Sequence, residues 1–241
     1  MSAYGSISRP SRASYLPSTA WQSPRDAHAF VTLHHIDQSA INLHPGLFDY
    51  LHSTFADEVD KGLTYPQEDV RDPNTFGAYF FGADVFVAIS SSGDITTKTE
   101  LEGDIKEVEM NLEGARGGRS WEECVTGFYY VKPNYPGRSS HICNAGFVVP
   151  PSQRGGGYGR VLARSYLHYA PSLGYTASVF NLVYVNNVAS VRLWEKLNFI
   201  KAGLIPKAGR LKRKDGPGEE YVDAWVFYKS FEDVNGDTTA T

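Results

Sequence analysis

A glycine-rich turn at residues 154–159 has residue types and spacing that suit a chemical task. The turn reads Arg-Gly-Gly-Gly-Tyr-Gly, and it stands between a strand-like run at residues 143–149 and a helical stripe of apolar residues. The first N–H groups of a helix lack partners inside the helix and lie at the positive end of its dipole. Because glycines let a phosphate approach that backbone closely, the turn suits a pyrophosphate.

The same turn departs from two other nucleotide-binding patterns. No Gly-Lys-Ser/Thr follows the glycines, so the turn is not a Walker-type phosphate loop. Its spacing is Gly-x-Gly-x-Gly and no acidic residue ends the following strand, which makes it a poor dinucleotide fingerprint. Taken alone, the turn also fits a flexible hairpin with no ligand, and that interpretation stays open.

Composition limits the class of protein that carries this turn. Of the 241 residues, 41% are hydrophobic and 13% aromatic, enough to bury a core and exclude wholesale disorder. The net charge of -4 lacks the basic footprint of a nucleic-acid-binding protein, and the apolar runs are far shorter than the ~20 residues of a spanning helix. We therefore expect a soluble protein with neither a nucleic acid nor a membrane as partner.

The two cysteines argue against metal chemistry. Cys124 and Cys143 both lie in apolar, strand-like runs, and no Cys-x-x-Cys or Cys/His cluster accompanies them. We expect buried free thiols in a reducing compartment and no metal site. A disulfide between paired strands stays open as the alternative.

Hydrophobic periodicity predicts the elements that position the turn. Strands are predicted at residues 30–36, 83–91, 123–131, 141–149, 175–185, 199–206 and 221–228. Helices are predicted at residues 45–61, after residue 159 and at residues 188–197, and Asn74 is the expected cap of a short helix that ends at Phe81. Strands in succession, followed by strands alternating with helices, predict a mixed α/β sheet.

One domain is predicted over residues 28–231, between flexible tails at residues 1–27 and 232–241. Residues 92–120 are charged and contain glycines, so we interpret them as a partly mobile hairpin insertion. The first 25 residues contain three arginines and no acidic residue, so we interpret them as a disordered tail, with a transit peptide as the alternative. The expected location is cytoplasmic or mitochondrial.

Two motifs together resemble the GCN5-related N-acetyltransferase (GNAT) superfamily. The pattern Arg154-x-x-Gly157-x-Gly159 is similar to its coenzyme A pyrophosphate loop, and NVASVRLWEKLNF at residues 187–199 is similar to its next helix. The resemblance covers about residues 30–230. It implies a mixed, mostly antiparallel sheet with a V-shaped splay between two parallel strands, here residues 141–149 and 175–185, with Gly146 as a natural bulge position.

Four shorter strings are similar to the fungal proline-analogue acetyltransferases in particular. They are GLTYPQ at residues 62–67, KPNY at 132–135, CNAGF at 143–147 and FNLV at 180–183. Those enzymes N-acetylate L-azetidine-2-carboxylate and related cyclic imino acids. The resemblance therefore implies acetyl-CoA as co-substrate, a detoxifying or antioxidant role and a homodimer. Two alternatives stay open: a different acceptor, such as another small amine or a protein N-terminus, or a non-catalytic acyl-CoA-binding module.

The resemblance also assigns roles to individual residues. It implies direct transfer through a tetrahedral intermediate, with Asn144, Asn181 and Leu182 as catalytic residues. Asn144 matches the substrate-binding asparagine, whose amide can donate to the carboxylate of an imino acid, and Tyr65 and Gln67 match the acceptor loop. The residues expected to bind acetyl-CoA are Phe147, Val148, Val149, Arg154, Gly155, Gly156, Gly157, Tyr158, Gly159, Asn187 and Ser190.

Proton transfer is where the chain departs from the superfamily. Trp194 stands where many members carry the tyrosine that protonates the leaving thiolate, and an indole cannot donate that proton at neutral pH. The two implied cleft strands contain no Asp or Glu, so no general base is evident. His141 is the candidate by position, and a water held by asparagines is the alternative. The basic turn at residues 212–214 is expected to be a solvated hairpin tip, with a contact to the coenzyme's 3′-phosphate as the alternative.

Overall fold

The computed structural model describes residues 15–92, 97–100 and 105–231. The described chain divides into two compact units. The N-terminal unit comprises residues 15–132 and 145–166, and the C-terminal unit comprises residues 133–144 and 167–231. Strand β7 (Ile142–Val148) and helix α6 (Tyr158–Ser172) contribute residues to both units.

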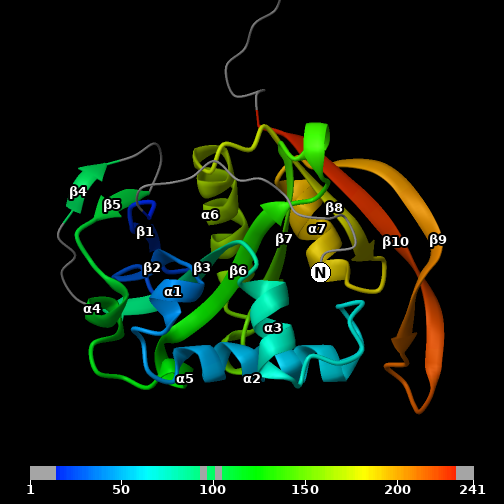
Figure 1. The fold of residues 1–241 in the computed structure, drawn as a ribbon, viewed down its shortest axis with the longest axis horizontal. Coiled ribbons are helices and arrows are strands. Elements are labelled where there is room, and N and C mark those ends of the chain that lie inside the picture. The colour runs from blue at the N-terminus through cyan, green and yellow to red at the C-terminus, as the bar shows by residue number, and fades with distance from the viewer. Residues whose placement is uncertain (1–14, 93–96, 101–104, 232–241) are drawn as a thin grey trace, which may run out of the picture. The chain divides into compact units, whose positions relative to one another are not determined.

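The N-terminal unit is built on an antiparallel sheet (Figure 1). Its strands follow the spatial order β4 (Thr97–Glu100), β5 (Lys106–Val108), β1 (Thr19–Gln22), β2 (Ala29–Ile36), β3 (Asp84–Ser92) and β6 (Val125–Pro133). The central register pairs Ile36 with Val85 and Asp84 with Val131. A shift in register interrupts the pairing of β3 with β6 between Ala88 and Ile89.

The described part of this unit also contains the helices α1 (Gln38–Ile41), α2 (Leu47–Lys61), α3 (Pro73–Phe80), α4 (Leu112–Arg116) and α5 (Trp121–Cys124). Helix α2 follows the predicted stripe, because Leu47, Leu51 and Phe55 are fully buried at four-residue steps. It ends at Gly62, whose φ of 63° is the left-handed conformation that glycine adopts without strain. The buried stripe packs with aromatic residues of α3 and β6 into one core.

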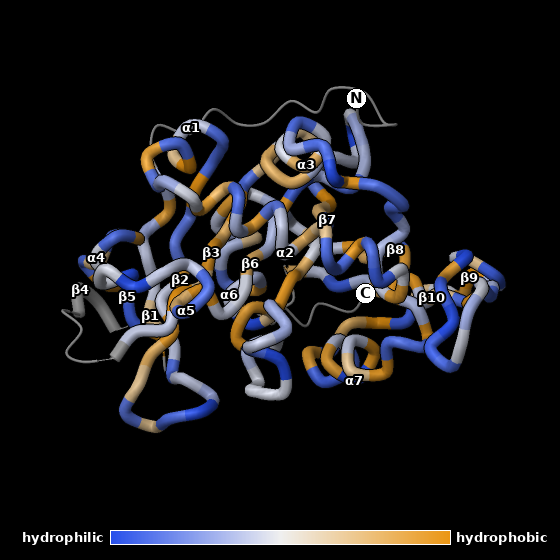
Figure 2. The backbone as a smooth tube through the Cα atoms, turned by 90° about the horizontal axis from the view of Figure 1, so that it is seen from below, coloured by the Kyte–Doolittle hydropathy of each residue, from blue (hydrophilic) through white to orange (hydrophobic). Residues whose placement is uncertain are grey.

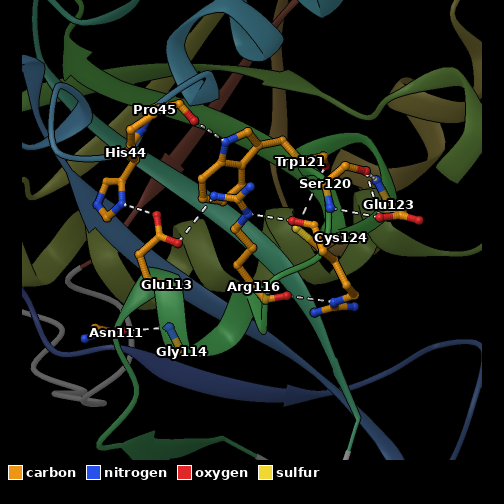
Figure 3. A network of polar contacts seen from close by, with 11 residues as sticks. His44, Pro45, Asn111, Glu113, Gly114, Arg116, Ser120, Trp121, Glu123 and Cys124 are labelled. Atoms are coloured by element: carbon orange, nitrogen blue, oxygen red, sulfur yellow. Dashed lines mark hydrogen bonds and ion pairs between the residues drawn. The ribbon is translucent and has the colours of Figure 1, made fainter.

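A polar network fastens the chain before α2 to helices α4 and α5 (Figure 3). Nδ1 of His44 lies 2.8 Å from a carboxylate oxygen of Glu113, and the other oxygen of Glu113 lies 3.4 Å from Arg116. The guanidinium of Arg116 sits 4.3 Å from the ring centre of Trp121, whose indole N–H donates to Pro45 O at 2.9 Å. These contacts make α4 and α5 part of the packed unit.

The C-terminal unit carries the strand order β7, β8 (Ala177–Tyr184), β10 (Glu219–Ser230) and β9 (Ile200–Lys212). Strands β7 and β8 are parallel, with Ile142 paired to Ala177, while β10 is antiparallel to both of its neighbours. Helix α7 (Val188–Lys196) alternates between apolar and polar residues, visible as orange and blue stretches in Figure 2. The predicted mixed α/β sheet, mostly antiparallel with one parallel pair, is confirmed.

Several expectations about the ends and the insertion need correction. Strand β1 lies inside the segment predicted to be a tail at residues 1–27, and its Ala20 and Trp21 are only 1% and 2% exposed. A four-residue strand between serines and prolines shows too little periodicity to be recognised. Residues 92–120 do contain an antiparallel pair, β4 with β5, but α4 buries Leu112 and Ala115 in the core, so this part is not a polar insertion. Residues 1–14 and 232–241 lie outside the described residues.

Smaller corrections concern caps and strand ends. Helix α3 is capped by Asp72, whose carboxylate accepts from two backbone N–H groups, and not by Asn74. Strand β9 runs to Lys212 and so takes up part of the predicted basic turn. Cys124 and Cys143 are buried free thiols as expected. Within the described ranges, no three metal-ligating side chains converge, and none of the helices has the length and hydropathy needed to cross a bilayer.

Candidate functional site

The glycine-rich turn forms the wall of a pocket in the N-terminal unit. The turn follows a short 3-10 helix at Pro151–Gln153 and leads into α6, which begins at Tyr158. Gly155 and Gly157 have φ values of 72° and 82°, a left-handed backbone that explains both glycines. The pocket measures about 540 Å³ and is lined by Pro24, Arg25, Arg154, Gly155, Gly156 and Gly157.

Arg25 is a pocket residue that the sequence did not reveal, since it lies in the predicted tail. Its guanidinium donates to the side chain and the backbone oxygen of Gln153 at 3.3 and 3.2 Å, and to Arg154 O at 3.4 Å. It also stacks 5.0 Å from the ring centre of Tyr158. A methyl group at Gly156 would collide with this guanidinium, so the middle glycine gives room to Arg25.

Arg154 is held from the opposite direction by Glu58 on α2. Its Nε donates to Val149 O at 3.1 Å, and its Nη2 lies 2.5 Å from Oε2 of Glu58. The other oxygen of Glu58 accepts from Thr64 Oγ1 at 2.7 Å. Burial raises the pKa of Glu58, but hydrogen bonds from Thr64 and Arg154 outweigh it, so the pKa lies below its ordinary value. The ionised Glu58 therefore joins the turn to the loop after α2.

The expected acceptor-loop residues lie in an aromatic cluster of the same unit. Tyr65 donates to Phe147 O at 2.9 Å, and burial raises its pKa well above the ordinary value. The hydroxyls of Tyr79 and Tyr130 lie 2.8 Å apart. Oε1 of Gln67 is buried without a hydrogen-bond partner.

Two more residues, Lys132 and Gly146, contact this aromatic cluster. The ammonium of Lys132 lies 3.9 and 4.2 Å from the ring centres of Tyr79 and Tyr130, and burial lowers the pKa of Lys132 to about 8. Gly146 was expected at a bulge. A Cβ there would collide with the ring of Tyr130, so close approach of that ring explains the glycine.

Asn144 and Asn181 are joined in the C-terminal unit through Asn134, which the sequence did not assign to the site. Nδ2 of Asn144 and Nδ2 of Asn181 both donate to Oδ1 of Asn134, each at 2.6 Å, and Nδ2 of Asn134 returns a bond to Oδ1 of Asn181 at 3.1 Å. Tyr135 donates to Asn181 Oδ1 at 3.5 Å. Asn134 is only 2% exposed, and its signal was the KPNY string, which marked the segment but not a role.

This network changes the chemistry expected of Asn144. One N–H of its amide is taken up by Asn134, while Oδ1 is buried and has no partner. The unused atom is thus a hydrogen-bond acceptor, which suits a donor such as an amine N–H better than a carboxylate. A buried acceptor left alone costs ~1–3 kcal/mol, which a ligand or a water can recover.

The remaining predicted residues have structural partners of their own. Oδ1 of Asn187 caps α7 by accepting from Ser190 N at 3.3 Å, and Ser190 Oγ accepts from the indole of Trp194 at 3.0 Å. Trp194 packs on Phe180 with ring centres 4.4 Å apart. His141 is exposed, with Nδ1 lying 3.1 Å from Arg138 O.

The structure thus groups the predicted residues by unit. The N-terminal unit contains the turn, Tyr65, Gln67, Phe147, Val148 and Val149, whereas the C-terminal unit contains Asn144, Asn181, Leu182, Asn187 and Ser190. Phe147 packs on Tyr129 and Val148 is buried, so the side chains of both serve the core. Leu182 is 36% exposed.

Sequence comparisons find relatives in fungi. A profile of the acetyltransferase (GNAT) family matches residues 98–199. N-acetyltransferase aca1 of Schizosaccharomyces pombe is 40% identical over 174 residues, which is 72% of this chain and 75% of aca1. Protein SPT10 of Saccharomyces cerevisiae is 30% identical over 229 residues, which is 86% of this chain but 35% of SPT10, so the chain spans about a third of that protein.

Solved structures share the fold at lower identity. A GCN5-related N-acetyltransferase from Kribbella flavida superposes with a TM-score of 0.57 at 22% identity, covering 82% of this chain and 97% of that one. The Salmonella typhimurium protein yncA, solved with its cofactor acetyl-CoA, gives a TM-score of 0.57 at 16% identity, covering 87% and 99%. At such identities the likeness concerns the fold alone.

Proposed function

Since the chain belongs to the GNAT family of N-acetyltransferases, we propose that it transfers the acetyl group of acetyl-CoA to the nitrogen of a small cyclic imino acid. L-azetidine-2-carboxylate, another proline analogue or a proline-pathway intermediate is the acceptor, and the role is detoxifying or antioxidant. The single observation that carries the choice of acceptor is the buried, unpartnered Oδ1 of Asn144.

The donor side of the proposal rests on the pocket at the glycine-rich turn. Arg25 and Arg154 both line it, and the N-terminus of α6 follows directly. The guanidinium of Arg25, the half-exposed guanidinium of Arg154 that Glu58 already pairs, and the backbone N–H groups at the start of α6 are donors for the oxygens of a pyrophosphate. The structurally similar yncA protein was solved with acetyl-CoA. These features support acetyl-CoA as the co-substrate, with its pyrophosphate at the turn.

The acceptor side of the proposal rests on the asparagine network. A neutral acceptor such as Asn144 Oδ1 binds an amine N–H without stabilising the protonated amine as a carboxylate would. The network of Asn134, Asn144 and Asn181 contains no acidic side chain. A polyamine, with several positive charges, calls for clustered carboxylates, so the network favours a small acceptor with a single amine.

The reaction that follows is direct acyl transfer. The deprotonated amine attacks the thioester carbonyl, a C–N bond forms, and the nitrogen loses its remaining proton to water before the tetrahedral oxyanion collapses with loss of the thiolate. Asn144 positions the amine through Oδ1, held in place by Asn134. The indole of Trp194 is already bonded to Ser190, so the leaving thiolate takes its proton from water.

The test measures thiol release from acetyl-CoA with L-azetidine-2-carboxylate as acceptor. We expect Asn144→Ala to lower kcat/KM for this acceptor about 100-fold, because a site built to bind an N–H loses its acceptor atom. The exposed Asn42, directly after α1, gives the matched control Asn42→Ala, which should behave as the wild type. Unaltered turnover by Asn144→Ala refutes the assignment, and tight CoA binding without any thiol release supports a non-catalytic acyl-CoA-binding module.

Two further parts of the proposal rest on the resemblance to the fungal enzymes and on composition. We propose a homodimer, which light scattering on the purified chain tests directly. We also propose a cytoplasmic or mitochondrial location, because the first 25 residues contain arginines and no acidic residue. A reporter fused to residues 1–30 distinguishes the two compartments.

A further inference from the structure

Lys132 lies in an aromatic cage within the N-terminal unit. Its Nζ is 3.9 Å from the ring centre of Tyr79 and 4.2 Å from that of Tyr130, and it donates to Tyr79 O at 3.4 Å. Tyr130 precedes Lys132 by two residues on β6, so both side chains stand on the same face of the strand. Tyr79 comes from α3 and meets the ring of Tyr130 edge to face at 5.4 Å.

This ammonium has no anionic partner among the described residues. Within this part of the chain it contacts the two rings and one backbone oxygen. Burial raises the pKa of Tyr79 and Tyr130, so both hydroxyls are neutral. Glu58 is already engaged by Arg154 and Thr64. The rings attract the cation through their π faces but cannot neutralise its charge.

A second buried polar group without a partner lies beside the cage, and it also indicates a ligand. Gln67 interacts with the hydroxyl of Tyr79, and its Oε1 is buried with no partner. Lys132 and Gln67 both contact Tyr79. The ammonium of Lys132 therefore lacks an anion, and Oε1 of Gln67 lacks a hydrogen-bond donor. Buried polar groups of folded proteins nearly always have partners, so such a pair points to a polar ligand. The same loop holds Tyr65, which is fixed to Phe147 O.

We infer that the ammonium of Lys132, in the cage of Tyr79 and Tyr130, binds the carboxylate of the acceptor substrate. The inference rests on the proposed function and deepens it by assigning the group that binds the free carboxylate of the imino acid. A carboxylate is the complementary charge that the cage lacks, and a charge-assisted hydrogen bond in a desolvated site is stronger than one in water. The neutralising group then arrives with the substrate.

The test compares two acceptors that differ only in charge, L-azetidine-2-carboxylate and its carboxamide. For Lys132→Gln we expect KM for the carboxylate to rise about 10- to 100-fold while kcat stays within a few-fold, because a charged partner is lost. With the carboxamide, the variant and the wild type should have the same KM. Lys132→Arg should recover part of the affinity, and the exposed Lys196→Gln is the matched control.

The outcomes separate this inference from the proposed function. An equal rise in KM for both acceptors, or a fall in thermal stability with no change in KM, overturns the role of Lys132 while acetylation of azetidine-2-carboxylate stands. If the wild type acetylates neither compound, the proposed function fails. Binding is then followed by NMR on isotope-labelled lysine: L-azetidine-2-carboxylate should shift the Lys132 resonance and raise its pKa above about 8, and the carboxamide should not. No shift with the carboxylate overturns the inference.

Discussion

Removing Asn134 tests whether one buried side chain positions the asparagines of the C-terminal unit. Asn134→Ala deletes three hydrogen bonds, from Asn144, from Asn181 and to Asn181. A net contribution of ~1 kcal/mol for each bond predicts a loss of about 3 kcal/mol in the free energy of unfolding. For a chain of this size that corresponds to a fall in Tm of roughly 6–12 °C, at roughly 2–4 °C for each kcal/mol.

The loss of activity should depend on whether the substituted residue keeps Oδ1 of Asn134. Asn134→Asp retains Oδ1, the oxygen that both Asn144 and Asn181 donate to, but replaces the donor to Asn181 with an oxygen that faces Asn181 Oδ1. We therefore expect kcat/KM for the acceptor to fall in the order wild type, Asp, Ala, with about a 10- to 100-fold loss for Ala since a misplaced group costs up to ~100-fold.

Urea unfolding and thiol-release assays on the same preparations measure both quantities, with Asn42→Ala as the control. If stability falls while kcat/KM is unchanged, Asn134 stabilises the fold but does not position Asn144 for the acceptor. Equal loss of activity in the Asp and Ala variants contradicts the argument that the shared oxygen positions Asn144.

Two further predictions concern other parts of the molecule. Arg25→Ala should raise the Kd for CoA about 10-fold, and Arg25→Lys should recover only part of it, because Arg25 lines the pocket at the turn; equal Kd values by calorimetry contradict this. Burial lowers the pKa of His34 from 6.5 to about 3, so below pH ~6.5 the unfolded chain binds a proton that the folded chain does not. Stability should therefore fall as the pH drops from about 6.5 toward 3, by up to about 1.4 kcal/mol for each unit from this group. His34→Gln should flatten that slope in urea unfolding at pH 7.5, 6 and 5, and parallel slopes contradict the assignment.

The parts that were predictable from sequence have strong local patterns. Helix α2 shows its buried stripe in the spacing of Leu47, Leu51 and Phe55, and the turn shows its glycines. Arg25 and Asn134 have no such pattern, because their partners lie 128 and 47 residues away along the chain. Glu58 did carry a signal: it is an acidic residue on the apolar face of α2, where an unpaired carboxylate would be costly.

Glu58 connects the glycine-rich turn, the proposed site of acetyl-CoA, to the loop proposed to bind the acceptor. One of its oxygens holds Arg154 at the glycine-rich turn, and the other holds Thr64 in the loop that leads to Tyr65 and Gln67. Replacing Thr64 to reshape that loop removes one of the hydrogen bonds that lower the pKa of Glu58 and fix its carboxylate against Arg154. We therefore predict that a substitution at Thr64, made to change the acceptor, also changes the affinity for CoA through the pairing of Glu58 with Arg154.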